Sequence, residues 1–152
     1  MDLLPLTGLG APDVALTLNR VALGAFFTIS GYHKLFNSTR HATFVQTLEA
    51  CKVPMIKINQ WFVPSVEFSG GLALLVGLLA PLAALGLIII CTVATCTDGI
   101  KRIPNWKPLD KADYVDCVLY LPEVLYIVML LMVFLCGAGT ISLDYMVLHT
   151  LG

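Results

Sequence analysis

The sequence predicts an all-α integral membrane protein that folds as a four-helix bundle. Its 152 residues are 58% hydrophobic and only 12% charged, whereas a soluble domain carries about 25% charged residues. The apolar residues are collected in segments long enough to cross the roughly 30 Å hydrocarbon core of a bilayer. The lipid bilayer is therefore the expected surrounding, and the net charge of −1 gives no indication of a nucleic-acid partner.

The first predicted span covers residues 14–36. Pro12 and Asp13 precede it, as is typical of a helix start. Lys34 stands near its far end, where a long side chain can reach the headgroups. The apolar run has no Lys or Arg before it and no small-residue cleavage site after it, so we expect a retained span and not a cleaved signal.

The first connection, residues 37–60, is polar but has an apolar stretch of its own. We expect residues 39–51 to form a short amphipathic helix at the membrane interface. Its apolar residues, among them Phe44 and Leu48, would then face the lipid.

Residues 61–97 contain a single charged residue, Glu67, and are too long for one span. As one helix they would extend roughly 55 Å, so the chain must fold back within the segment. Pro81 would disturb a continuing helix. We therefore predict a tight hairpin, with the second span over residues 61–79 and the third over residues 81–97.

The second connection, residues 98–116, balances four basic residues against four acidic ones. A fourth span is predicted over residues 117–137, with Pro122 in its first turn. The four spans would form a single domain over residues 1–152.

Basic residues outside the spans gather in the two long connections. Lys and Arg are enriched in the cytoplasmic loops of membrane proteins. The protein is therefore expected to be multi-pass, with both connections in the cytoplasm and both termini on the outer side.

Small residues at helical spacing predict close helix contacts, because they let two helix backbones approach each other within the membrane. On the first span these residues are Gly24 and Gly31. On the second span Ser69, Ala73 and Gly77 repeat every four residues.

Charged residues within the spans are the candidates for a functional site. Such groups usually face a partner, a cavity or a substrate path. Arg20 on the first span and Glu67 on the second are expected to form an ion pair, because an unpaired charge in hydrocarbon is very costly.

Glu123 is the corresponding charge on the fourth span. It lies near the inner end, level with His33 and Lys34, and we expect it to contact one of them. Tyr120 shares a helical face with Glu123 and would extend this polar core.

Two interpretations of the polar core stay open. The charges either pair to set the register of the helices, or they line a polar pocket for a small molecule, a proton or a quinone. The sequence contains no catalytic triad, phosphate-binding loop, metal-ligand motif or dinucleotide fingerprint. No catalytic residue and no metal ligand is therefore predicted.

Three stretches carry a family resemblance. They are NRVALGAFFTISGYHKLF at residues 19–36, VEFSGGLALLVGLLAPLAALGL at residues 66–87 and GAGTISLD at residues 137–144. In this order they resemble the DoxX-like family of small four-span bacterial membrane proteins. Ala138 stands where the family's final motif, G-P-G-x-x-S-L-D, has proline.

The resemblance implies a location in the bacterial cytoplasmic (inner) membrane. Arg20, Glu67 and Gly71 match positions of the family's sequence pattern. The resemblance therefore implies a polar core similar to the family's, and it makes Gly71 a further candidate for helix packing. Family members are linked with membrane redox systems, and one is a subunit of thiosulfate:quinone oxidoreductase. Quinone is the candidate cofactor, although a shared fold does not transfer a reaction.

Three functions are consistent with these observations. The first is an accessory subunit or assembly partner of a membrane-bound oxidoreductase complex, without catalytic residues of its own. Its partners would be other membrane subunits or further copies of the chain. The second is a quinone-interacting oxidoreductase subunit of the thiosulfate:quinone type. The third is a small-solute or proton permease, which the lack of an internal repeat makes less attractive.

Overall fold

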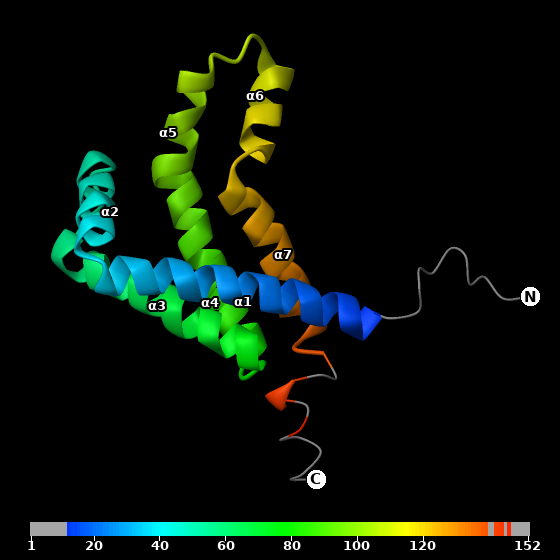
Figure 1. Ribbon diagram of the computed structural model, residues 1–152. Helices are drawn as coiled ribbons and strands as arrows, with labels where there is room; N and C mark the ends of the chain where they lie inside the picture. Colours follow the sequence, from blue (N-terminus) through cyan, green and yellow to red (C-terminus); the bar gives the residue numbers. More distant parts are fainter. Residues whose placement is uncertain (1–11, 140–141, 145, 147–152) are drawn as a thin grey trace, which may run out of the picture.

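The computed structural model describes residues 12–139, 142–144 and 146. Within these residues all regular structure is helical, which confirms the predicted all-α class (Figure 1). The elements are α1 (Pro12–Phe36), α2 (Ser38–Ala50), α3 (Ile56–Val76), α4 (Ala80–Ala94), the π-helix η2 (Thr95–Gly99), α5 (Ile100–Arg102), the 3-10 helix η3 (Ile103–Trp106), α6 (Lys111–Leu119) and α7 (Pro122–Cys136).

The helices form two antiparallel pairs that cross. α1 packs along α3, and α4 packs along α7. Figure 1 shows α4 and α5 rising away from the α1–α3 pair, with α6 and α7 returning beside them. α2 leaves the end of α1 on the same side.

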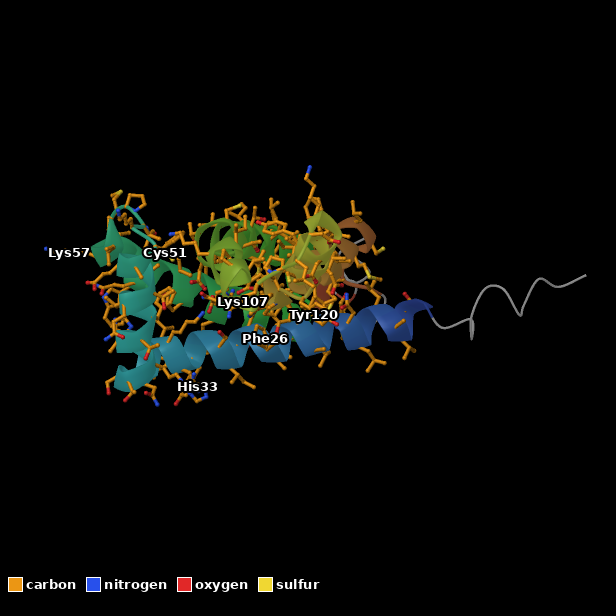
Figure 2. The ribbon with its side chains drawn as sticks, turned by 90° about the horizontal axis from the view of Figure 1, so that it is seen from above. Phe26, His33, Cys51, Lys57, Lys107 and Tyr120 are labelled. Carbon is orange, nitrogen blue, oxygen red and sulfur yellow. The ribbon has the colours of Figure 1, made fainter. Side chains whose placement is uncertain are left out.

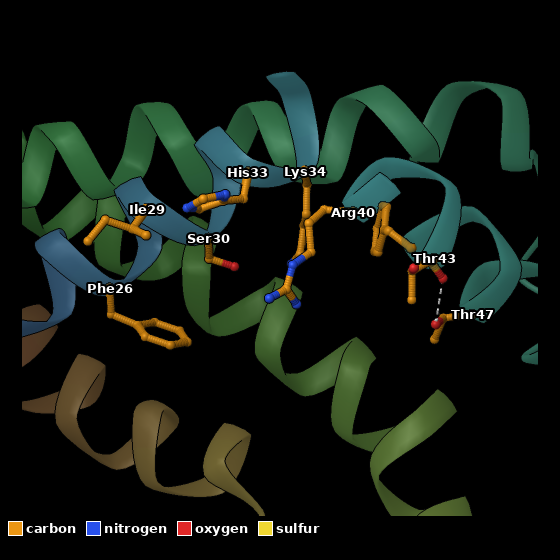
Figure 3. A pocket seen from close by; sticks show the side chains of 9 residues that line it. Phe26, Ile29, Ser30, His33, Lys34, Arg40, Thr43 and Thr47 are labelled. Carbon is orange, nitrogen blue, oxygen red and sulfur yellow. Dashed lines mark hydrogen bonds between the residues drawn. The ribbon is translucent and has the colours of Figure 1, made fainter. Parts of the chain in front are cut away.

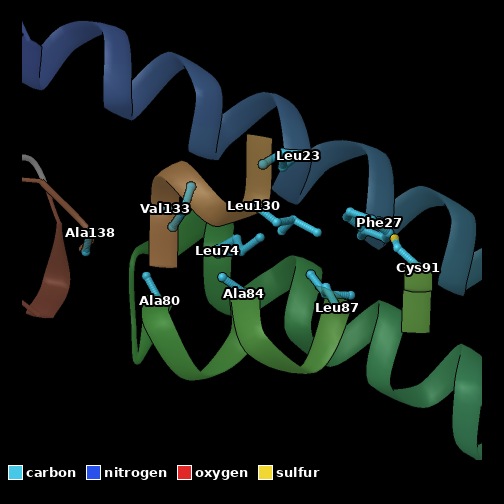
Figure 4. Packing of buried hydrophobic residues seen from close by; sticks show 10 residues of the cluster. All are labelled: Leu23, Phe27, Leu74, Ala80, Ala84, Leu87, Cys91, Leu130, Val133 and Ala138. Carbon is cyan, nitrogen blue, oxygen red and sulfur yellow. The ribbon is translucent and has the colours of Figure 1, made fainter. Parts of the chain in front are cut away.

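The hydrophobic core lies where these two pairs meet (Figure 4). It contains residues from α1, α3, α4 and α7, together with one that follows α7: Leu23, Phe27, Leu74, Ala80, Ala84, Leu87, Cys91, Leu130, Val133 and Ala138. Many other large apolar side chains are exposed, for example Leu135 at 77% and Leu18 at 66%. An apolar surface of this extent is expected of a protein surrounded by lipid.

Two of the described helices are long and apolar enough to cross a membrane. They are Asp13–Phe36 and the continuous helix Ala80–Trp106, and the bent pair of α6 and α7 makes a third if it counts as one span. α3 is not among these candidates. The helices therefore support a membrane protein, while the number of four spans stays a prediction.

The predicted hairpin between the second and third spans is present. α3 ends at Val76, and Gly77 caps it in the left-handed conformation with φ of 71°. α4 begins at Ala80 with Pro81 in its first turn, where the missing N–H of proline leaves no hydrogen bond unmade. α3 also begins earlier than predicted, at Ile56 instead of residue 61.

The third span is longer than predicted. We expected it to end at residue 97, but helix continues through η2, α5 and η3 to Trp106. Within these polar residues Arg102 pairs with Asp98 one turn earlier, with Arg102 Nε 3.1 Å from Asp98 Oδ2, and such a pair favours helix.

The fourth span is broken where we expected one helix over residues 117–137. α6 ends at Leu119, α7 starts at Pro122, and the two are bent by 60°. Leu121 is extended, with ψ of 122°. The cause is local, because a proline disfavours the helical conformation in the residue before it.

The short helix predicted over residues 39–51 exists as α2, and Asn37 caps it by accepting a hydrogen bond from the backbone nitrogen of Arg40. The prediction that Leu48 faces the lipid is wrong, since Leu48 is only 8% exposed. It lines a pocket against α3 and α4, because α2 also packs on α3.

Candidate functional site

Three glycines bring α1 and α3 into contact, as predicted for Gly24, Gly31 and Gly71. A Cβ added to Gly24 would lie 2.9 Å from the carbonyl oxygen of Gly71, and one added to Gly31 would lie 2.5 Å from the backbone nitrogen of Phe68. A Cβ on Gly71 would overlap the backbone nitrogen of Thr28. Because backbone atoms cannot move aside individually, these contacts set the register between the two helices.

The predicted stripe of Ser69, Ala73 and Gly77 is not the contact face of α3. Ser69 is exposed, and its hydroxyl donates to the carbonyl of Ser65 at 2.8 Å. Ala73 is half-buried. Only Gly77 is buried, at the turn after the helix. The face that packs is one position further along the helix, around Gly70 and Leu74.

The α1–α3 register places Glu67 opposite Lys34 and Ser30. Lys34 Nζ donates to both carboxylate oxygens of Glu67 at 2.7 Å, and Ser30 Oγ donates to Oε2 at 3.2 Å. Glu67 is only 6% exposed. The Lys34 ammonium also lies 5.1 Å from the ring centre of Phe44 on α2. The buried carboxylate therefore has a charged and a neutral donor.

The predicted ion pair between Arg20 and Glu67 is wrong. Arg20 and Lys34 lie fourteen residues apart on α1, which is about 21 Å along the helix, and the register gives Glu67 to the Lys34 end. Arg20 is 2% exposed and lies at the opposite end of the pair. Its guanidinium passes so close to Gly77 that a Cβ there would overlap it.

Asp144 is a further charged residue at the Arg20 end, and the sequence analysis did not single it out. Its carboxylate accepts hydrogen bonds from the backbone nitrogens of Leu79 at 2.8 Å and Ala80 at 3.1 Å. Its own nitrogen donates to the carbonyl of Gly77 at 3.0 Å, and its charge attracts Arg20. The available signal was the third stretch of the family resemblance, which ends at this residue.

Asp144→Ala should destabilise the protein by about 2 kcal/mol, because it removes a charged cap from the first turn of α4. Thermal unfolding of the purified protein in detergent measures this. Asp116→Ala is the matched control, since Asp116 is exposed on α6. Equal unfolding temperatures for the two variants would show that the cap contributes nothing.

A pocket of about 340 Å³ opens beside the Lys34–Glu67 pair. α2, α3, α4 and η2 contribute most of its wall. Most of its side chains are apolar: Phe44, Leu48, Val53, Phe62, Val63, Ile89, Ile90, Val93 and Ala94. Four charged side chains also line it, namely Lys34, Glu67, Asp98 and Glu123. Such a pocket suits a ligand with an apolar body and a few hydrogen-bonding atoms.

Glu123 lines this pocket but does not pair with His33 or Lys34 as expected. It accepts a hydrogen bond from Arg102 Nη2, and Arg102 also pairs with Asp98. The difference arises because the third span continues as helix past residue 97, which brings Arg102 to the start of α7. The π-helix η2 lies just before it, and such π-segments often occur at functional sites.

Neither His33 nor Tyr120 belongs to the polar core, contrary to expectation. His33 is exposed near the end of α1 (Figure 2). Tyr120 is 74% exposed at the bend between α6 and α7 (Figure 2). The bend separates Tyr120 from Glu123, which we had placed on one continuous helical face.

A second pocket, of about 460 Å³, lies on the other side of Lys34 (Figure 3). Side chains of α1 and α2 line it, including His33, Arg40 and Thr43. Lys34, Phe44 and Thr47 line both pockets and so stand between them.

The comparisons with known proteins agree with the resemblance in the sequence. A family model described as DoxX matches residues 15–98, which is more than half of the chain. This region contains α1, α2, α3 and α4 almost entirely, and so includes the Lys34–Glu67 pair. No curated protein and no solved structure matches the chain.

Proposed function

The chain belongs to the DoxX family, and from this we propose that it is the quinone-binding membrane subunit of an oxidoreductase complex. The observation that carries the proposal is the Lys34–Glu67 pair, with its buried carboxylate, in the wall of a mostly apolar pocket. A quinone has an apolar ring and tail with two carbonyl oxygens. Such a molecule needs an apolar pocket with a hydrogen-bond donor in its wall, and Lys34 is such a donor here.

Three of the charged groups of the pocket have a role in this proposal. Lys34 is the donor for one quinone carbonyl oxygen, and Glu67 holds the ammonium in place through its two 2.7 Å contacts. Glu123, held by Arg102, is the second ionisable group, available to exchange a proton. Reduction of a quinone to a quinol takes up two electrons and two protons. The electrons come from a redox centre on a partner subunit.

The proposal includes the position of the protein in the cell. We place the single domain of residues 1–152 in the bacterial cytoplasmic membrane with four spans and with both termini on the outer side. The pocket then lies towards the cytoplasmic end of the first span, because Lys34 is near the C-terminal end of α1. Other membrane subunits or further copies of the chain would cover part of the exposed apolar surface.

Glu67→Gln tests the quinone site. The substitution keeps the size of the side chain but removes the charge that holds Lys34, so we expect a short-chain quinone to bind about tenfold more weakly. Calorimetric titration of the purified protein in nanodiscs measures the affinity. Glu49→Gln is the matched control, because Glu49 is an exposed carboxylate of α2 and does not line the pocket.

Equal affinities for wild type, Glu67→Gln and Glu49→Gln would refute the quinone site. The subunit part has a separate test, which is purification from native membranes in mild detergent. We expect stoichiometric co-purification of a redox protein. A chain that binds quinone but always purifies without partners would overturn the assignment as a complex subunit.

A further inference from the structure

The pocket between α1 and α2 has a lining of distinctive charge (Figure 3). All of its ionisable side chains are basic types: His33, Lys34 and Arg40. Three hydroxyls also line it, from Ser30, Thr43 and Thr47, but each already donates its proton within the protein. We propose that this pocket binds the phosphate headgroup of an anionic phospholipid. The inference does not depend on the proposed quinone site.

The arrangement of the two helices brings these groups together. On α2, Arg40, Thr43 and Thr47 follow one another at helical spacing and so share a face. On α1, Ser30 and His33 do the same. The short link at Asn37 turns the chain, so that α2 rises steeply from the end of α1. The two polar faces therefore meet across one opening.

Arg40 is the main candidate for the phosphate contact. Lys34 is partly neutralised by Glu67, whereas no ion pair to Arg40 is found within residues 12–139, 142–144 and 146. A guanidinium offers a fork of donors that matches the oxygens of a phosphate. Arg40 thus adds an uncompensated positive charge at the mouth of the pocket.

The rest of the pocket favours a lipid over a free anion. Phe26 and Ile29 line it about two turns and about one turn before Lys34 on α1, and they are 43% and 58% exposed. They extend the pocket into apolar surface along the first span. An acyl chain attached to the headgroup would lie along this surface, which a free phosphate ion would leave uncovered.

Arg40→Gln is the test, with Lys57→Gln as the matched control. Lys57 is exposed in the first turn of α3 and points away from the pocket (Figure 2). Each protein is placed in nanodiscs of phosphatidylcholine with or without phosphatidylglycerol, and the lipids retained after extraction are counted by native mass spectrometry. We expect wild type and Lys57→Gln to retain phosphatidylglycerol selectively, and Arg40→Gln to retain about fivefold less.

Two further arms complete the experiment. His33→Leu removes a second basic-type side chain from the lining and should also reduce retention, so the test does not depend on Arg40→Gln alone. Equal losses of phosphatidylglycerol retention for Arg40→Gln and Lys57→Gln would show that general surface charge causes the effect. This result would overturn the proposed binding site. If inorganic phosphate displaces phosphatidylglycerol as readily as added phosphatidylglycerol does, the site binds a free anion and the lipid assignment is wrong.

Discussion

Gly71→Ala is expected to force α1 away from α3 and to lower the free energy of unfolding by about 3 kcal/mol or more. The added methyl group would overlap the backbone nitrogen of Thr28 and would press on the carbonyl of Gly24. Neither atom can rotate aside as a side chain would. The helices must therefore separate, and the Lys34–Glu67 contact further along the same interface would lengthen.

Gly86→Ala is the matched control for this substitution. Gly86 is also within a helix, but a Cβ there would meet only the Val66 side chain at 3.7 Å. This variant should be neutral or more stable by up to about 1 kcal/mol, because alanine reduces the entropy of the unfolded chain. Denaturant unfolding in detergent micelles compares the two variants. If Gly71→Ala unfolds like Gly86→Ala, the close approach of the helices is not required.

Lys34→Met should cost about 3 kcal/mol, because it leaves the buried Glu67 carboxylate without its charged partner. Methionine keeps most of the length and apolar stem of lysine. The loss should therefore report the missing charge and not a cavity. Thermal unfolding of the purified variant measures the effect, and Lys57→Met controls for loss of an exposed lysine.

The double variant Lys34→Met with Glu67→Met separates the charge effect from packing. Removing both charges leaves no buried carboxylate unpaired, so we expect the double variant to be more stable than Lys34→Met alone. Additive losses in the double-mutant cycle would contradict a direct interaction between the two side chains. The result also bears on function, since a stable double variant that loses quinone affinity would assign the pair to ligand binding.

Much of the fold could be predicted from the order of the residues. Long apolar segments indicate helices in lipid, Pro81 marks the hairpin, and the short helix after residue 37 is present as α2. These features depend on neighbouring residues only. Helix ends were less predictable, because Arg102 and Asp98 stabilise helix beyond the apolar part of the third span.

The pairing of the charges could not be predicted in the same way. The sequence identified Arg20, Glu67 and Glu123 as the charges within the spans, and each is buried or lines a pocket. Their partners depend on the distance that one helix slides past another. Arg20 and Lys34 lie about 21 Å apart along α1, and no local pattern says which of these two positions meets Glu67.

The sequence by itself determined that this chain is an all-helical DoxX membrane protein with charges inside its apolar segments. Only the tertiary structure decided that Glu67 pairs with Lys34, that Glu123 pairs with Arg102, and that Asp144 lies with Arg20. The physical reason is that composition and periodicity describe the residues along one helix and do not determine how that helix lies against its neighbours. Register and bends, set by backbone contacts at Gly71 and by Pro122, act between helices.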